Sequence, residues 1–160
     1  MTVENRTATV TVNAAFLQEI KDVHQELWRA FTELQGICHD AQQIHERPRD
    51  VVELLIQLRD QLALHFSLEE AYGYFDDPIR VAPHLSESAK RLRDEHEVLY
   101  GTFATLTEDM EERHRSGELP KSSDELVERF SRYYTEMQSH EARENELILR
   151  AYDDDIGVGD

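Results

Sequence analysis

Cysteine is almost absent from this sequence, and long apolar runs are missing altogether. Cys38 is the only cysteine, so the chain cannot form an internal disulfide or a thiolate cluster for zinc or iron–sulfur. No apolar run reaches the roughly 20 residues that a membrane-spanning helix needs, and the N-terminus lacks the pattern of a signal peptide. A cytoplasmic location is therefore the default expectation.

Basic residues are also scarce. The 160 residues include 17 lysines and arginines against 34 aspartates and glutamates, which gives a net charge of −17. Such a surface would repel phosphate groups, so neither nucleic acid nor an anionic membrane is expected as a partner. Solvated carboxylates on helix faces account for most of the excess acid. The sequence does not indicate an oligomeric state.

Only four prolines and six glycines interrupt the chain, and the prolines fall between four stripes of apolar residues spaced three and four apart. Such spacing is typical of amphipathic helices. The stripes cover residues 17–41, 51–72, 85–110 and 126–151. We predict an all-α fold, an up-down-up-down antiparallel four-helix bundle over residues 13–152. Residues 1–12 alternate polar and β-branched types and are interpreted as a short extended N-terminal arm, with Asn13 capping the first helix, and residues 153–160 as an acidic tail.

Six side chains that commonly ligate metals occupy seam positions where leucine would be expected. Four are histidines, one on each predicted helix, and two of these are followed four residues later by a glutamate. They are His24, His65, Glu69, His96, His140 and Glu144. In consecutive antiparallel helices, two residues lie at one level when the turn falls midway between them. The midpoints between these histidines fall at or within a few residues of the predicted turns, so we expect the six side chains to meet in one layer.

The two histidine–glutamate pairs have a chemical logic of their own. Residues four apart stack on one helix face, so each pair can offer an imidazole to one ion and a carboxylate to the space between two ions. Imidazole and carboxylate ligands suit iron, manganese, zinc or copper. Two carboxylates against two divalent ions leave a positive site that favours an anionic ligand. The alternative interpretation is a set of salt bridges that only stabilise the bundle, since an unpaired buried carboxylate would be costly.

Other residues near the seam are interpreted without a direct role. Four histidines beside the seam or near turns are expected to be solvated, namely His39, His45, His84 and His114. Apolar residues around the six ligands are expected to form a dry wall, namely Leu27, Trp28, Phe31, Leu62, Leu68, Leu92, Leu99 and Met137. Tyr72 and Tyr100 lie one turn from Glu69 and His96, and either pack with the hydroxyl toward the rim or serve as a ligand or proton donor.

The segments around these positions resemble the hemerythrin-like, or HHE cation-binding, family over about residues 14–152. The matching segments are Asp-Val-His24-Gln-Glu-Leu, His65-Phe-Ser-Leu-Glu69-Glu70, Asp-Glu-His96-Glu-Val-Leu and Ser-His140-Glu-Ala-Arg-Glu144. In that family a four-helix bundle holds a non-haem di-iron centre. The resemblance implies two iron ions joined by an oxo or hydroxo bridge. It assigns His24 and His65 to one iron, His96 and His140 to the other, and Glu69 and Glu144 to bridging positions.

The chain departs from the oxygen-carrying hemerythrins at two places. Those proteins have two histidines four apart on the third helix, whereas the positions that flank His96 at this spacing are Leu92 and Tyr100. They also carry an aspartate five residues after the fourth-helix histidine, where this chain has Glu144 at four. The missing histidine leaves a position for water, an exogenous ligand or Tyr100. Ferritin-like di-iron proteins fit less well, because their motif runs Glu-x-x-His, with the carboxylate first.

Three functions follow from these interpretations. The leading one is a non-haem di-iron protein that binds or senses dioxygen, nitric oxide or iron. The second is a di-iron enzyme acting on peroxide or dioxygen. The third is a metal-free structural or interaction bundle. The partner that the first two imply is a small ligand such as dioxygen, nitric oxide, peroxide or a similar anion.

Overall fold

The structure is a computed structural model that describes the backbone of residues 3–71 and 82–159. Side chains are described for residues 18–19, 21–71, 82–151 and 153. The elements are α1 (Val3–His39), α2 (Gln42–Glu46), α3 (Pro48–Ala71), η1 (Pro83–Leu85), α5 (Ser86–Arg115), η2 (Pro120–Ser122) and α6 (Ser123–Gly159). The described part of the chain contains no strand, which confirms the predicted all-α class.

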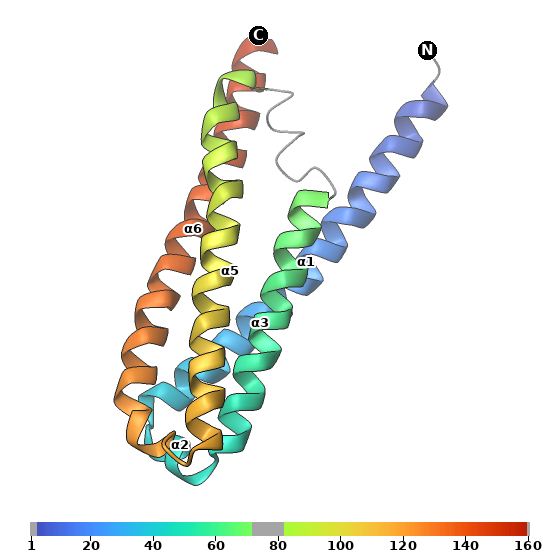
Figure 1. Cartoon of the computed structure of the whole chain (residues 1–160). Coiled ribbons are helices and arrows are strands. Elements are labelled where there is room, and N and C mark those ends of the chain that lie inside the picture. Colours follow the sequence, from blue (N-terminus) through green and yellow to red (C-terminus); the bar gives the residue numbers. More distant parts are fainter. Residues whose placement is uncertain (1–2, 72–81, 160) are drawn as a thin grey trace.

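Four long helices pack side by side (Figure 1). Helix α1 packs against α3, α3 against α5, and α5 against α6, and α6 returns to contact α1. In Figure 1 the chain descends along α1, ascends along α3, descends along α5 and ascends along α6. Each long helix is therefore a neighbour of the next in the chain, which brings one inward-facing stripe from each of them to a common core.

The turns between the long helices follow local sequence signals. Pro48 opens α3, where its missing N–H is not needed by the helix. After α5, Gly117 adopts a φ of +77°, a left-handed conformation that glycine tolerates at a helix end. Pro120 then begins the short η2 turn that leads into α6. The predicted loop around Pro78 lies mostly outside the described residues.

The two chain ends differ from the sequence-based expectation. Helix α1 begins at Val3, so the residues expected to form an extended arm are helical, and Asn13 lies inside the helix rather than at its cap. No proline or glycine interrupts residues 3–35, so nothing in that stretch stops a helix. At the other end α6 continues to Gly159 through the residues assigned to a tail. The division into arm, domain and tail stays a prediction.

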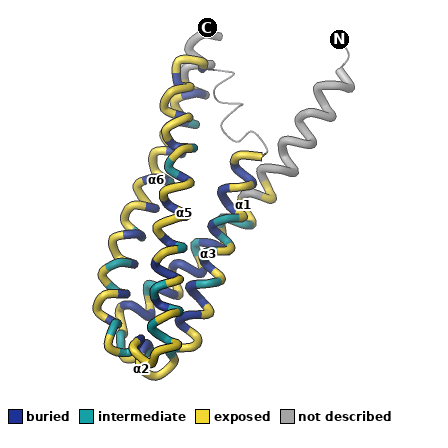
Figure 2. The backbone as a smooth tube through the Cα atoms, viewed as in Figure 1, coloured by how far each residue is buried: buried dark blue, intermediate teal, exposed yellow. Residues whose placement is uncertain are grey.

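The buried residues form two apolar clusters, and Figure 2 shows them along the inward faces of the helices. The larger cluster includes Phe31, Leu55, Phe103 and Phe130 and fills the end of the bundle near α2. The smaller cluster consists of Ala82, Leu85, Ala89, Leu92, Leu147 and Ala151. On α5 and α6 the two clusters are separated by buried polar residues, which form the site described below.

Within the described residues, no helix is both long and apolar enough to cross a membrane.

Candidate metal centre

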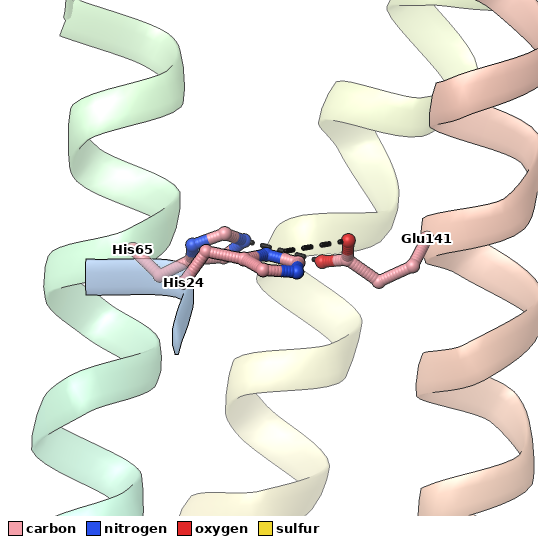
Figure 3. Close-up of side chains that lie close together, drawn as sticks. All are labelled: His24, His65 and Glu141. Carbon is pink, nitrogen blue, oxygen red and sulfur yellow. Dashed lines mark hydrogen bonds and ion pairs between the residues drawn. The ribbon is translucent and has the colours of Figure 1, made fainter. Parts of the chain in front are cut away.

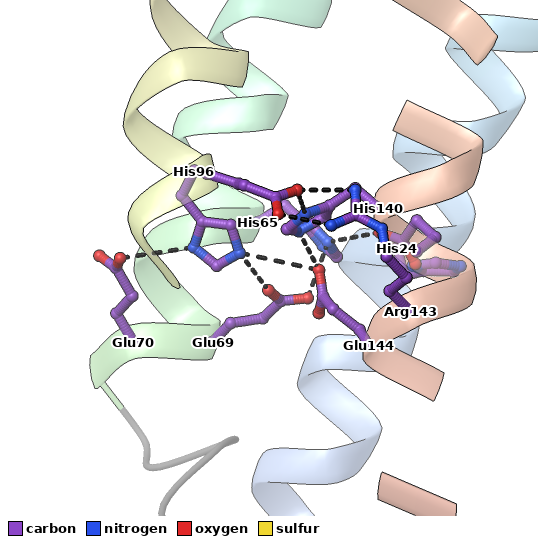
Figure 4. Close-up of polar contacts among 10 residues, drawn as sticks. His24, His65, Glu69, Glu70, His96, His140, Arg143 and Glu144 are labelled. Carbon is purple, nitrogen blue, oxygen red and sulfur yellow. Dashed lines mark hydrogen bonds and ion pairs between the residues drawn. The ribbon is translucent and has the colours of Figure 1, made fainter. Parts of the chain in front are cut away.

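All six side chains predicted as ligands lie at one level of the bundle, and all four long helices contribute to it (Figure 4). Five of the six are buried, although all carry polar atoms. These five are His65, Glu69, His96, His140 and Glu144. His24 on α1 is the exception, because 39% of its side chain is exposed. The expected polar pocket in an apolar interior is therefore present, with one histidine at its rim.

The helical spacing produces the two histidine–glutamate pairs as expected. On α3, His65 Nε2 lies 2.9 Å from Glu69 Oε1. On α6, His140 Nε2 contacts Glu144 Oε1 in the same i, i+4 arrangement. Each pair presents its nitrogen and its oxygen toward the centre of the bundle, where the pairs from α3 and α6 meet.

Glu69 lies between histidines from two different helices. Its Oε1 faces His65 Nε2 on α3, and its Oε2 lies 3.2 Å from His96 Nε2 on α5. The two oxygens of one carboxylate therefore point at two different imidazoles. This is the arrangement required of a carboxylate that bridges two ions, each of which is held by one of those imidazoles.

Glu144 also contacts histidines from two helices, but through a single oxygen. Its Oε1 contacts His140 Nε2 and lies 3.7 Å from His96 Nε2. Its Oε2 is buried and accepts no hydrogen bond from the described residues. A buried carboxylate oxygen without a donor is costly, and a cation would remove that cost.

Glu141 is a seventh residue at the site, and the sequence analysis missed it. Figure 3 shows it directed from α6 toward His24 and His65. Its Oε1 lies 3.2 Å from His65 Nε2, and its Oε2 lies 3.6 Å from His24 Nδ1. Only 14% of the side chain is exposed. Its signal in the sequence is its place directly after His140, one step off the seam, which a stripe of spacing three and four does not include.

Two further glutamates contact the outer nitrogens of the buried histidines. Glu70 Oε1 lies 3.4 Å from His96 Nδ1, and Glu95 Oε1 lies 3.0 Å from His140 Nδ1. Arg143 in turn donates to both oxygens of Glu95. A carboxylate that accepts the Nδ1 proton leaves Nε2 as the basic nitrogen, directed inward, and this arrangement is common around metal-ligating histidines.

The pKa values of the buried histidines and of Glu69 show how their charges compensate one another when no ion is bound. Burial lowers the pKa of His65, but hydrogen bonds with Glu141 and Glu69 outweigh burial and raise it to about 10. The pKa of His96 is raised to about 9, because Glu144 and Glu69 outweigh its burial. Burial raises the pKa of Glu69, but hydrogen bonds with His65 and His96 outweigh it and lower the value to about 2. Imidazolium–carboxylate pairs therefore hold the site together when no ion is bound.

Three overlapping groups of the described side chains could each hold a metal ion. Two groups each bring two imidazoles and one carboxylate to within 4.8 Å of one another, His24 with His65 and Glu141, and His96 with His140 and Glu144. A third group, whose ligand atoms also lie within 4.8 Å of one another, consists of Glu69, Glu141 and Glu144. Mixed nitrogen and oxygen donors suit iron, manganese or zinc. The described geometry thus offers two ligand groups of mixed nitrogen and oxygen donors, with Glu69 in contact with a histidine of each.

The surroundings of the site are apolar on one side and open on another. All but one of the predicted wall residues are buried, and Trp28 is half-buried. The ring of Phe66 stacks on His96 at a centroid distance of 4.2 Å. A groove of about 410 Å³ between α3 and α5 reaches His96, and Tyr100 and Arg93 line it. Tyr100 is therefore at the mouth of the site, while Tyr72 lies outside the described residues.

The other four histidines lie away from this layer. His39, His45 and His84 are exposed, as expected, whereas His114 is half-buried near the end of α5. The groups of possible ligands found among the described residues include none of the four.

The fold and the site together define an α-helical bundle with a buried histidine–glutamate centre able to hold metal ions. The family model for the hemerythrin HHE cation binding domain matches residues 15–152. The chain belongs to this family, as the sequence resemblance predicted. Searches of curated proteins and of solved structures found no match to the chain.

Proposed function

We propose that this protein is a non-haem di-iron protein that binds or senses dioxygen, nitric oxide or iron. The observation that carries the proposal is the position of Glu69, whose two oxygens face His65 and His96 from different ligand groups. A carboxylate shared by two ions needs both contacts, and the two contacted imidazoles belong to different ligand groups. Membership of a cation-binding family supports the same conclusion.

The proposed roles of the six predicted ligands follow the two groups. His24 and His65 would hold one iron, and His96 and His140 would hold the other, since each pair belongs to one group of possible ligands. Glu69 would supply the carboxylate shared by both ions, and Glu144 a carboxylate beside His96 and His140 that the family resemblance assigns to a bridging position. Bound iron would supply Lewis acidity and redox chemistry toward a small ligand such as dioxygen, nitric oxide or peroxide.

The protein's own residues set the conditions for that ligand. The apolar wall keeps bulk water from the buried carboxylates and imidazoles, which strengthens their electrostatic interactions. The groove at His96 gives a path from solvent. The position four residues after His96 is Tyr100 rather than the second histidine of the oxygen carriers, so we place binding or sensing ahead of reversible oxygen transport.

Gently purified protein is expected to contain about two iron ions per chain and, after exposure to air, to show the near-ultraviolet absorption of an oxo-bridged ferric pair. Elemental analysis and an optical spectrum measure both. The variant His65→Leu should lose most of this metal, because it removes a buried imidazole of the site. His39→Leu is the matched control, since His39 is exposed and distant from the layer, and it should keep the metal. Absence of stoichiometric metal from the wild type would favour the metal-free structural bundle.

A second candidate function is an enzyme that turns over peroxide or dioxygen. The observation in its favour is the location of Tyr100 in the groove that reaches His96. A phenol there can donate a hydrogen to a small ligand at the site. This activity would use the same metal centre, so it extends the proposed binding function rather than replacing it.

If this enzyme exists, Tyr100→Phe is expected to lower steady-state peroxide consumption by about 100-fold, a typical contribution of a positioned proton donor. Iron content should not change, because Tyr100 lines the groove and is exposed, whereas the carboxylates of the site are buried. Tyr134→Phe is the control, since Tyr134 packs against Trp28 and Phe130 instead of lining the groove. Equal peroxide consumption by both variants would show that Tyr100 takes no part in the reaction. A wild type that consumes no peroxide would refute the enzymatic function.

A further inference from the structure

Glu141 is adjacent to His140 in the chain but faces a different part of the site. One residue along a helix turns the side chain by about 100°. His140 therefore meets His96 and Glu144 beside α5, whereas Glu141 points toward α1 and α3. Its two oxygens approach two different histidines, His65 at 3.2 Å and His24 at 3.6 Å.

A salt bridge alone explains this contact poorly. His65 Nε2 has two carboxylate oxygens close to it, Glu69 Oε1 at 2.9 Å and Glu141 Oε1 at 3.2 Å. One N–H can direct a straight hydrogen bond to only one of them. Divalent metal ions hold nitrogen and oxygen ligands at about 2.1 Å, and two such ligands at right angles are about 3 Å apart. Both distances therefore fit three ligand atoms that surround one ion.

The two ligand groups become equivalent when Glu141 is counted. Around His96 and His140, Glu144 is the carboxylate that belongs to the group. Around His24 and His65, the six predicted ligands provide only Glu69, which is shared with His96. Glu141 supplies the missing one, so that each group has two imidazoles and one carboxylate, with Glu69 between them.

Glu141 also differs from the other glutamates that contact the histidines from outside the predicted set. Glu70 and Glu95 face Nδ1 atoms on the outer edges of His96 and His140. Glu141 faces His65 Nε2, the nitrogen that also contacts Glu69. Its carboxylate is therefore on the inner side of the ring, where an ion would lie.

We propose that Glu141 is a third carboxylate ligand, which binds the ion held by His24 and His65. This inference rests on the proposed di-metal function. With three carboxylates, two divalent ions would leave the site with a net charge of +1 instead of +2. A site richer in oxygen donors prefers iron or manganese to copper, and its lower charge attracts small anions less strongly.

The test is anaerobic titration of the metal-free full chain with Fe²⁺, followed by calorimetry and elemental analysis. Glu141→Gln is expected to bind one ion as the wild type does and the second at least ten-fold more weakly, because an amide is neutral and a poorer ligand. Glu146→Gln makes the same change of charge at an exposed position on the same helix and should bind both ions unchanged.

Two further variants separate ligation from charge and remain informative if Glu141→Gln does not fold. Glu141→His offers a ligand atom without a negative charge, and Glu141→Asp keeps the charge on a shorter side chain. Recovery of the second ion by Glu141→His supports ligation. Two ions of unchanged affinity in Glu141→Gln would overturn the inference. A wild type that binds no ion would instead refute the di-metal function itself.

Discussion

Glutamine in place of Glu69 is expected to reduce the iron content from two ions per chain to one or fewer. Glu69 is the residue whose oxygens reach histidines of both ligand groups, so its loss affects both ions. Its negative charge also offsets the repulsion between two cations about 3.5–4 Å apart, the usual separation in two-metal sites. The neutral amide provides neither effect at full strength. Elemental analysis of protein loaded anaerobically with Fe²⁺ measures the result.

Glu97→Gln is the matched control for this change. Glu97 is directly beside His96 on α5 but is exposed, so the substitution removes the same charge without entering the buried layer. Iron content should stay at the wild-type value in Glu97→Gln. Circular dichroism of both metal-free variants would check that the helices remain. Two ions retained by Glu69→Gln would contradict a bridging role for this carboxylate.

The stability of the metal-free protein is expected to fall as the pH rises from about 7 to about 10. The pKa values of His65 and His96 are about 10 and about 9 in the folded chain, against about 6.5 for an unfolded histidine. Raised values mean that folding favours the protonated imidazoles. Their contribution is complete below about pH 6.5 and is lost as the pH passes 9–10, and it amounts to a few kcal/mol, because one pKa unit is about 1.4 kcal/mol. Urea denaturation with a chelator at several pH values measures this loss.

The affinity for iron should change in the opposite direction over the same pH range. An ion binds the neutral imidazole, so the protons on His65 and His96 must leave when it binds. Higher pH therefore weakens the metal-free fold and strengthens metal binding. Calorimetric titration in two buffers of different ionisation enthalpy would count the released protons. A metal-free stability that stays constant between pH 7 and 10 would contradict the imidazolium–carboxylate pairs described above.

Acid should destabilise the metal-free chain through Glu69. Its pKa is lowered to about 2 in the folded state, so the stability that it contributes is complete above the unfolded value of about 4.3 and is lost as the pH falls toward 2. Urea denaturation extended to low pH would measure this loss of stability. The metal-free protein is thus expected to be most stable between about pH 5 and 6.5, between the two titrations.

The central layer was predictable from the sequence because the helix period determines it. Polar residues at positions reserved for leucine are unusual, and the distances from His65 and His140 to the predicted turns gave a common height. Five of the six residues are buried where they were expected. The position of the turns predicts the level of a residue along the bundle but not its burial. His24 follows the same spacing and yet lies at the rim of the site.

Other features could not be predicted from the same signals. Glu141 is off the seam, and only the packing of α6 against α1 turns it toward the site. The outer contacts of Glu70 and Glu95 depend on how neighbouring helices are rotated, which an apolar stripe does not specify. At the N-terminus, alternating threonine and valine suggested an extended segment, but weak propensities do not stop a helix without a breaker.

The charged layer also divides the interior into unequal halves. The smaller apolar cluster, at the start of α5 and the end of α6, contains no side chain larger than leucine, whereas the other half holds most of the aromatic rings. Without ions, the imidazolium–carboxylate pairs of this layer connect the two apolar halves. Ions coordinated by side chains from all four helices would add further bonds across this layer. Metal occupancy at the centre would thereby control how often the distant helix ends separate.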